Sequence, residues 1–268
     1  FSDRLEKLLH ETNFELAAVG IGCPGPIDIE KGLVLSPVNL PDWNRFPLVE
    51  KITTRYRVPT ALDNDPNAAA LGEYSGGAGR GVRNFFYVTI STGIGGAIVC
   101  DGKIHHGIRA SAGEIGHTIV KPEGELCRCG ARGCLETIAS GRNIARRLKE
   151  KLARRNGGSR DGGFDEITAE TVVEAARQGD TAAAEIWAET IHYLGIGIGN
   201  AVTLFAPEAV VIGGGVASAK EFLLGPLRRE IRKNVRMLPV EKVQIRPASL
   251  GQESGVCGGL VVARRAMH

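Results

Sequence analysis

Aromatic side chains are scarce in this 268-residue chain, where they make up 5% of the residues, and the net charge is only +3. A nucleic-acid-binding surface normally combines a basic face with exposed aromatic residues, so both shortages argue against one. The chain also lacks any apolar run near the roughly 20 residues that span a bilayer. We therefore expect a cytoplasmic protein with neither a membrane nor a nucleic acid as its partner.

The N-terminal residues do not look like the start of a complete gene product. Residues Phe1 to Arg4 include no starting Met and show no signal-peptide organisation. We expect the sequence to begin part-way into a longer chain. No internal repeat is visible, so a solenoid or repeat array is not expected.

Glycine is the abundant residue, with 36 occurrences, about double its average usage. The glycines cluster beside apolar runs, as loops that approach phosphates require. Apolar residues make up 43% of the chain, enough for a substantial core. Short strand-like runs alternate with stretches of helical spacing, which predicts an α/β fold. Strands are expected at 15–22, 59–62, 84–92, 97–100, 209–212 and 243–247, and helices at 48–56, 65–74, 135–155, 168–177, 181–205, 220–235 and 255–266, with a polar loop at 156–164.

The expected strand 84–92 is followed by a glycine-rich turn, Gly93 to Gly96, and by a second strand that ends at an Asp101-Gly102 hairpin turn. A Rossmann or P-loop nucleotide site has a helix, not a strand, after its glycine-rich turn. The pattern therefore predicts a phosphate-binding loop of another kind.

Three of the six cysteines are scattered in apolar or glycine-rich surroundings: Cys23, Cys100 and Cys257. We expect these three to be buried free thiols. The other three fall within eight residues, in the run from Cys127 to Cys134, and such a cluster in a cytosolic chain favours a metal over a disulfide.

The clustered cysteines are separated by Gly130 and Gly133, which permit sharp turns. A tetrahedral zinc needs a fourth donor, and His117 lies ten residues upstream. The alternative is a loop of reduced cysteines beside a core histidine. Four protein ligands would leave no open coordination position, so the zinc would be structural. The predicted ligands are His117, Cys127, Cys129 and Cys134.

Two segments resemble the signature of the ROK (repressor, open reading frame, kinase) family of sugar kinases and regulators. Glu114 to His117, followed by Cys127 to Glu136, resembles its zinc segment, and Asn64 to Glu73 resembles its catalytic segment. Four further segments resemble its sugar-side and nucleotide loops: 22–28, 39–43, 91–96 and 212–216.

The resemblance implies an actin-like ATPase (ribonuclease H-like) fold, with two α/β domains around a cleft. The smaller domain would comprise residues 1–63 and 253–268, and the larger one, with the zinc site and the dimer surface, residues 64–252. It also implies ATP and Mg²⁺ as cofactors beside the zinc, and a homodimer or a dimer of dimers.

The resemblance assigns Asp65 as the general base, with a zinc-bound His117 that touches sugar through its other ring nitrogen. Phosphoryl transfer needs such a proton acceptor, and it needs the phosphate charge to be neutralised. Carboxylates and amides form hydrogen bonds with sugar hydroxyls well. Sugar would be bound by Asn39, Asn64, Asp65, Glu114, His117 and Glu136, and nucleotide by Thr92, Gly93, Gly95, Gly213, Gly214 and Gly215.

Each role has a purely structural alternative. Asp65 could cap a helix, Glu136 could be a first-turn charge that favours the helix dipole, and Glu114 could be a surface carboxylate. Glycines 213–215 could simply end a strand. The basic run 142–155 is interpreted as a solvated helix face.

The chain departs from the ROK pattern because it lacks the N-terminal hairpin that carries an Asp-x-Gly-Gly-Thr phosphate loop. We expect the 268-residue chain alone to be a poor catalyst, or the full gene product to be longer, and full sugar kinase activity of this chain would refute that. An N-terminal helix-turn-helix would instead make a sugar-responsive transcriptional regulator, the first alternative function.

The substrate is predicted from segments 39–43, 73–74 and 77–80, which look most like the glucokinase branch. We predict phosphorylation of glucose at its 6-hydroxyl. A kinase for N-acetylglucosamine or N-acetylmannosamine is the other alternative.

Overall fold

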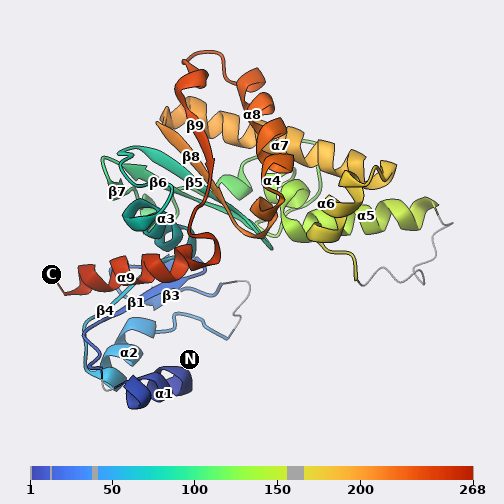
Figure 1. Ribbon diagram of the computed structural model, residues 1–268. Helices are drawn as coiled ribbons and strands as arrows, with labels where there is room; N and C mark the ends of the chain where they lie inside the picture. The colour runs from blue at the N-terminus through green and yellow to red at the C-terminus, as the bar shows by residue number, and fades with distance from the viewer. Residues whose placement is uncertain (1, 13, 38–41, 156–165, 268) are drawn as a thin grey trace.

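The computed structural model describes residues 2–12, 14–37, 42–155 and 166–267 (Figure 1). Its mixture of strands and helices confirms the α/β class. The strands are β1 (Val19–Cys23), β2 (Ile27–Asp28), β3 (Leu33–Val34), β4 (Thr60–Asn64), β5 (Phe85–Ile90), β6 (Ile94–Cys100), β7 (Lys103–Ile104), β8 (Ala209–Gly213) and β9 (Gln244–Pro247). The α-helices are α1 (Ser2–Thr12), α2 (Leu48–Tyr56), α3 (Asp65–Gly76), α4 (Leu135–Ala139), α5 (Gly141–Arg155), α6 (Ala169–Arg177), α7 (Thr181–Phe205), α8 (Glu221–Asn234) and α9 (Ser254–Ala266).

The main sheet has five strands in the order β7-β6-β5-β8-β9. β8 runs parallel to both β5 and β9, whereas β6 pairs antiparallel with β5. Side chains alternate between the two faces of a strand. Phe86 and Val88 accordingly join one apolar cluster, with residues of α7 and α8, while Phe85 and Tyr87 join a second cluster, with residues of α3 and α9. Both faces of the sheet are therefore covered, as Figure 1 shows.

Several of the abundant glycines serve helix packing instead of phosphate binding. A Cβ on Gly258 of α9 would lie 1.6 Å from the carbonyl oxygen of Ala68 in α3, and one on Gly72 of α3 would lie 2.2 Å from that of Ser254. Only residues without a side chain allow this approach. Helix α7 packs in the same way, because a Cβ on Gly195 would lie 2.4 Å from the Cβ of Glu230 in α8. The close packing predicted for this long helix is therefore confirmed.

The smaller sheet pairs β1 with β4 in parallel, with Cys23 opposite Asn64. Because the carboxyl ends of parallel strands meet at one edge, the loop after β1 lies beside the residues that follow β4. The β2–β3 hairpin and residues near it complete an apolar cluster that includes Ile27, Val34 and Leu62. Helix α9 contacts β1 and β4 as well as α3, and so joins the two sheets (Figure 1). The domain boundaries at residues 63 and 253 stay a prediction.

The structure corrects the expected single helix 135–155. α4 ends at Ala139 because Ser140 is extended (φ −71°, ψ 154°), and α5 begins at Gly141. The break is held by a hydrogen bond of 2.7 Å from the Gly141 N–H to the carbonyl of Ser91. The Ser140 hydroxyl also accepts a hydrogen bond of 3.4 Å from the Asn143 N–H, as an N-cap does, so the interruption has both a local and a tertiary support.

Other boundaries also shift. The first strand begins at Val19 and not at residue 15, and the turn after β5 is Ser91 to Gly93, so that Gly95 and Gly96 lie within β6. Helix α1 and the β2–β3 hairpin were not predicted from the sequence. The loop expected at 156–164 lies outside the described residues.

The scattered cysteines differ from expectation in two of three cases. Cys23 is buried as predicted, but Cys100 is exposed and Cys257 is half-buried. Cys100 is the last residue of β6, next to the Asp101-Gly102 turn, where the chain reaches solvent. Among the described residues, no helix is long and apolar enough to cross a membrane.

Candidate active site

A cavity of about 920 Å³ opens where β4 meets α3. It is bordered by the loop after β1, by the loop after β5 and by the segment 108–117. Five of the predicted sugar-binding residues line it, whereas the sixth, Asn39, lies outside the described residues. The five are Asn64, Asp65, Glu114, His117 and Glu136.

Asp65 is the first residue of α3, directly after the last residue of β4. Desolvation inside the cavity raises the pKa of its carboxyl, a hydrogen bond from the Asp65 backbone N–H lowers it in part, and the charge of Glu114 raises it again. Asp65 is not the helix cap, since Asn64 occupies that position and makes no side-chain capping bond. A carboxylate that is open to a cavity, with a pKa raised above its ordinary value, has the properties of a general base.

Asn64 is 6% exposed, and its Oδ1 has no hydrogen-bond partner among the described residues. A Cβ on Gly25 would lie 3.7 Å from the Asn64 amide nitrogen, so the loop after β1 passes close over this side chain. A buried amide oxygen without a partner is costly, and a ligand hydroxyl can satisfy it. Asn64 is therefore well suited to hydrogen-bond a sugar.

The predicted metal ligands come together in space. The donor atoms of His117, Cys127, Cys129 and Cys134 all lie within 4.8 Å of one another. The His117 Nδ1 is 3.6 Å from the Cys127 Sγ, and the Sγ atoms of Cys129 and Cys134 are also 3.6 Å apart. Such separations fit donors that surround one tetrahedral zinc with bonds of about 2.0–2.3 Å. The donor set therefore fits a structural zinc.

His117 connects this cluster with the cavity. Its Nδ1 faces the cysteines, while the residue also lines the cavity beside Glu114 and Glu136. Burial raises the pKa of Glu114, His117 lowers it in part, and Glu136 raises it again. Three potential sugar ligands thus lie directly at the two ends of the segment that a zinc would hold.

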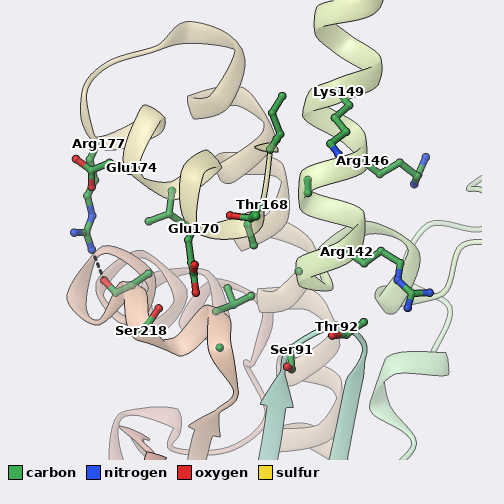
Figure 2. A pocket seen from close by; sticks show the side chains of 18 residues that line it. Ser91, Thr92, Arg142, Arg146, Lys149, Thr168, Glu170, Glu174, Arg177 and Ser218 are labelled. Atoms are coloured by element: carbon green, nitrogen blue, oxygen red, sulfur yellow. Dashed lines mark hydrogen bonds between the residues drawn. The ribbon is translucent and has the colours of Figure 1, made fainter. Parts of the chain in front are cut away.

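A second cavity, of about 780 Å³, lies between α5, α6 and the short helix Gly215–Ala219 (Figure 2). Figure 2 shows Arg142, Arg146 and Lys149 on α5 on one side, Thr168 and Glu170 at the start of α6, and Ser218 across from them. Ser91 and Thr92, at the end of β5, line both cavities. The two cavities therefore meet at this loop.

The predicted nucleotide-binding glycines divide into three groups. Gly93 and Gly95 line the first cavity, and Gly215 lines the second. Gly213 and Gly214 line neither, because a Cβ on them would lie 2.4 Å from the Tyr87 hydroxyl and from the Ile90 carbonyl oxygen. These two glycines allow β8 to pass its neighbour β5, and their contact with a nucleotide stays a prediction.

Several cavity-lining residues were not predicted from the sequence. The basic helix 142–155 was interpreted as a solvated face, yet Arg142, Arg146 and Lys149 line the second cavity. Their spacing places them on one side of α5, the only signal that the sequence offered. Ile108 to Ser111 line the first cavity through a loop that has no regular pattern.

The loop between the cavities is held by the segment that follows the cysteines. The carboxylate of Glu136, in α4, accepts a hydrogen bond of 2.8 Å from the backbone N–H of Ile94. The Gly141 N–H, at the start of α5, donates to the carbonyl of Ser91. Both ends of the turn Ser91 to Ile94 are therefore attached to the α4–α5 junction.

Comparisons with known proteins agree with this arrangement. The sequence profile of the ROK family matches residues 3–266. A glucokinase of Halalkalibacterium halodurans is 38% identical over 265 residues, which are 96% of this chain and 80% of that protein. A xylose repressor of Caldicellulosiruptor bescii is 33% identical over 246 residues, 91% of this chain and 61% of the repressor.

Among solved structures, a ROK family glucokinase from Streptomyces griseus in complex with glucose and AMPPNP superposes with a TM-score of 0.82 at 35% identity. The match covers 98% of this chain and 87% of that chain. This likeness confirms the expected actin-like ATPase fold. On its sequence and its structure alike, the chain belongs to the ROK family.

Proposed function

We propose that this protein catalyses the ATP-dependent phosphorylation of a hexose, with glucose as the preferred substrate and its 6-hydroxyl as the acceptor. The observation that carries the proposal is the position of Asp65. Its carboxylate is solvent-accessible in the wall of the cavity that holds the candidate sugar ligands, and that cavity meets a second one at Ser91 and Thr92. Phosphoryl transfer requires an acceptor hydroxyl and a phosphate chain to meet beside a proton acceptor.

In the proposed mechanism, Asn64, Glu114, His117 and Glu136 bind the sugar hydroxyls and orient the ring. Asp65 accepts the proton of the attacking hydroxyl as the hydroxyl oxygen bonds to the γ-phosphorus. The bond from the γ-phosphorus to the oxygen that bridges it to the β-phosphate breaks, and ADP leaves. The turn at Thr92 and Gly93 brings peptide groups close to the phosphates, because Gly93 has no side chain. Mg²⁺ would neutralise charge on the β- and γ-phosphate oxygens.

The second cavity is proposed to hold the nucleoside part of ATP. Its wall combines apolar atoms of Ala145, Ile167 and Val173 with the carboxylate of Glu170 and with basic residues of α5. Such a mixture can enclose a base while polar groups fix its orientation. Gly215 permits the chain to approach the ligand without a side chain.

The cysteines and His117 are proposed to hold a zinc ion. With four protein ligands the metal would leave no open position, so it would supply rigidity and no chemical step. The rigid segment would fix His117 and the adjacent Glu114 and Glu136 in the first cavity.

The choice of glucose rests on relatives named as glucokinases, which include proteins of Halalkalibacterium halodurans and Thermotoga maritima at 38% and 36% identity. A ROK transcriptional regulator remains the second candidate, because xylose repressors are also similar. The cavity-lining carboxylate of Asp65 favours the kinase, since a regulator that only binds sugar needs no proton acceptor.

The test is a coupled assay of ADP release by the full-length protein, with ATP, Mg²⁺ and a panel of sugars. We expect glucose to give the highest kcat/KM, and Asp65→Asn to lower kcat by roughly 10²- to 10⁴-fold. A strong preference for N-acetylglucosamine or N-acetylmannosamine would refute the glucose assignment. No turnover with any sugar, together with salt-dependent DNA binding, would favour the regulator.

We further propose that the protein acts in the cytoplasm as a homodimer, or as a dimer of dimers, without a nucleic-acid partner. Light scattering coupled to size exclusion tests the assembly. A monomer at micromolar concentration would contradict it.

A further inference from the structure

The loop Gly107 to Ser111 forms part of the sugar-side cavity, and its backbone is unusual. Arg109 and Ala110 both adopt positive φ angles, 50° and 58°. Residues other than glycine are strained in this region, so a loop of this shape persists only when its surroundings hold it. Four consecutive residues of the loop, Ile108 to Ser111, line the cavity. The shape of the sugar-side cavity therefore depends on what holds the loop.

His106 closes the base of this loop and anchors it. Its carbonyl accepts a hydrogen bond of 3.0 Å from the Ala112 N–H, across the loop. Its ring Nε2 lies 2.9 Å from the Oδ2 of Asp63, the residue before Asn64 in β4. A carboxylate oxygen only accepts, so the imidazole donates through Nε2. The loop leaves the main sheet at β7, yet this bond attaches it to the smaller sheet.

Asp63 is buried, with a side chain only 4% exposed, and both of its oxygens are used. Its Oδ1 accepts hydrogen bonds of 2.8 Å from the backbone N–H of Asn64 and from the side-chain amide of Asn67. Its Oδ2 accepts from His106, and Arg265 of α9 lies 3.9 Å from the same oxygen. One carboxylate therefore connects the cavity loop with the residues on either side of Asp65.

The loop is also seated by one apolar contact. Ala110 is 5% exposed and belongs to the cluster of Cys23, Ile27, Val34 and Leu62 in the smaller sheet. Ile108, by contrast, is 83% exposed, so its side chain contributes little anchoring. Among the described residues, the Asp63–His106 bond and the burial of Ala110 therefore both hold the loop against the sheet that carries Asn64.

We propose that Asp63 and His106 are positioning residues for the hexose, which hold the Gly107–Ser111 loop in place as a wall of the sugar-side cavity and align it with the start of α3. The proposal rests on the proposed function for its substrate. Neither residue lines the cavity, so neither contacts the sugar. Their effect passes through the loop and through the backbone of Asn64.

The test compares His106→Ala, His106→Gln and His106→Asn in the full-length protein. Gln can place an amide N–H near the position of Nε2, whereas Asn is too short to reach it. His192→Ala is the matched control. His192, in α7, also faces a carboxylate, that of Glu230 in α8, but this pair is far from the loop in sequence.

The first readout is amide hydrogen exchange of residues 107–112 without any ligand. We expect faster exchange in His106→Ala and His106→Asn, and wild-type exchange in His106→Gln and His192→Ala. Unchanged exchange in His106→Ala would overturn the proposal, whether or not the protein is a kinase.

The second readout is steady-state kinetics. Loss of one charge-assisted hydrogen bond should raise the hexose KM by about tenfold, and leave the ATP KM within about twofold. His106→Gln should restore the hexose KM. Equal increases in both KM values, or no rescue by Gln, would mean general destabilisation and overturn the proposal. A wild-type protein without hexose kinase activity would instead refute the proposed function, and the exchange data alone would then decide whether the pair holds the loop.

Discussion

The carboxylate of Glu136 accepts a hydrogen bond of 2.8 Å from the backbone N–H of Ile94, although the two residues are 42 positions apart. Glu136 lies two residues after Cys134, and Ile94 begins β6 directly after the turn that both cavities share. The cysteine cluster, the sugar-side cavity and the turn between the cavities are thus one connected unit.

This bond predicts that Glu136 affects both substrates. In Glu136→Ala the hexose KM should rise because a sugar ligand is lost, and the ATP KM should rise by several-fold because the Ile94 N–H loses its acceptor. Glu136→Gln keeps an acceptor oxygen, so it should restore the ATP KM more fully than the hexose KM. Steady-state kinetics measures both. An ATP KM that stays at the wild-type value in Glu136→Ala would show that the bond does not support the turn.

Replacement of Cys129 by Ala should abolish zinc binding, since three donors remain. Without the metal, Glu114, His117 and Glu136 lose their common support, and the hexose KM should rise by roughly 10- to 100-fold, the scale seen when supporting shells of metal sites are removed. Elemental analysis measures zinc per chain. The control is Cys100→Ala, because Cys100 is exposed and outside the cluster. A zinc-free Cys129→Ala variant with a normal hexose KM would show the metal to be dispensable.

The raised pKa of Asp65 predicts an acid limb in the pH profile of kcat. The general base must be ionised, so the rate falls as the pH drops through the pKa of Asp65, which burial and Glu114 hold above its ordinary value. Glu114→Gln removes the repelling charge, so the acid limb should move to lower pH, whatever happens to KM. An acid limb that moves to higher pH, or not at all, would argue against Asp65 as the titrating group.

Glu73 should be a stability residue and not a catalytic one. Its side chain is fully buried and accepts hydrogen bonds from the backbone N–H groups of Ala78 and Leu250 and from the Ser254 hydroxyl, among others. Burial alone would raise the pKa of Glu73, but these bonds outweigh it and hold the pKa below its ordinary value. The carboxylate thereby ties the end of α3 to the segment that enters α9.

A depressed pKa stabilises the fold at pH above the value of the unfolded chain, and this contribution is lost as pH falls through the folded pKa. Glu73→Gln should therefore lower the free energy of unfolding by about 2–4 kcal/mol at pH 7, because an amide cannot accept all these bonds. Chemical denaturation at pH 7 and below pH 4 measures the free energy of unfolding of both proteins. The difference between wild type and Glu73→Gln should be smaller at the lower pH. Glu150→Gln, at an exposed position of α5, is the control. A Glu73→Gln variant as stable as wild type at pH 7 would refute the role.

The sequence predicted those parts of the fold and site that depend on local patterns. The cysteine spacing identified the metal cluster, and the strand before Asn64 placed Asp65 at the start of a helix at the cavity wall. The break at Ser140 was missed although Ser140 is a preferred N-cap residue, and the contact between Gly141 and Ser91 that also supports it leaves no local signal.

The features that local patterns did not show depend on tertiary contacts. Gly213 and Gly214 look like a phosphate loop in sequence, but the space beside them is filled by Tyr87 and Ile90. The loop 107–111 was missed because its shape is held by Asp63, more than forty residues earlier in the chain. A contact of that range leaves no periodic signal in the sequence.

The central claim is that Asp65 takes the proton from a hexose hydroxyl as ATP transfers its phosphoryl group. The most direct measurement is the rate of hexose 6-phosphate formation by wild type and by Asp65→Asn, together with the Tm of each. We predict that Asp65→Asn loses roughly 10²- to 10⁴-fold in kcat, the usual range for loss of a general base. Its Tm should be at least as high as that of wild type, because desolvation in the cavity and the charge of Glu114 disfavour the charge that the substitution removes. Hexose phosphorylation at an undiminished rate by a folded Asp65→Asn protein would contradict the account.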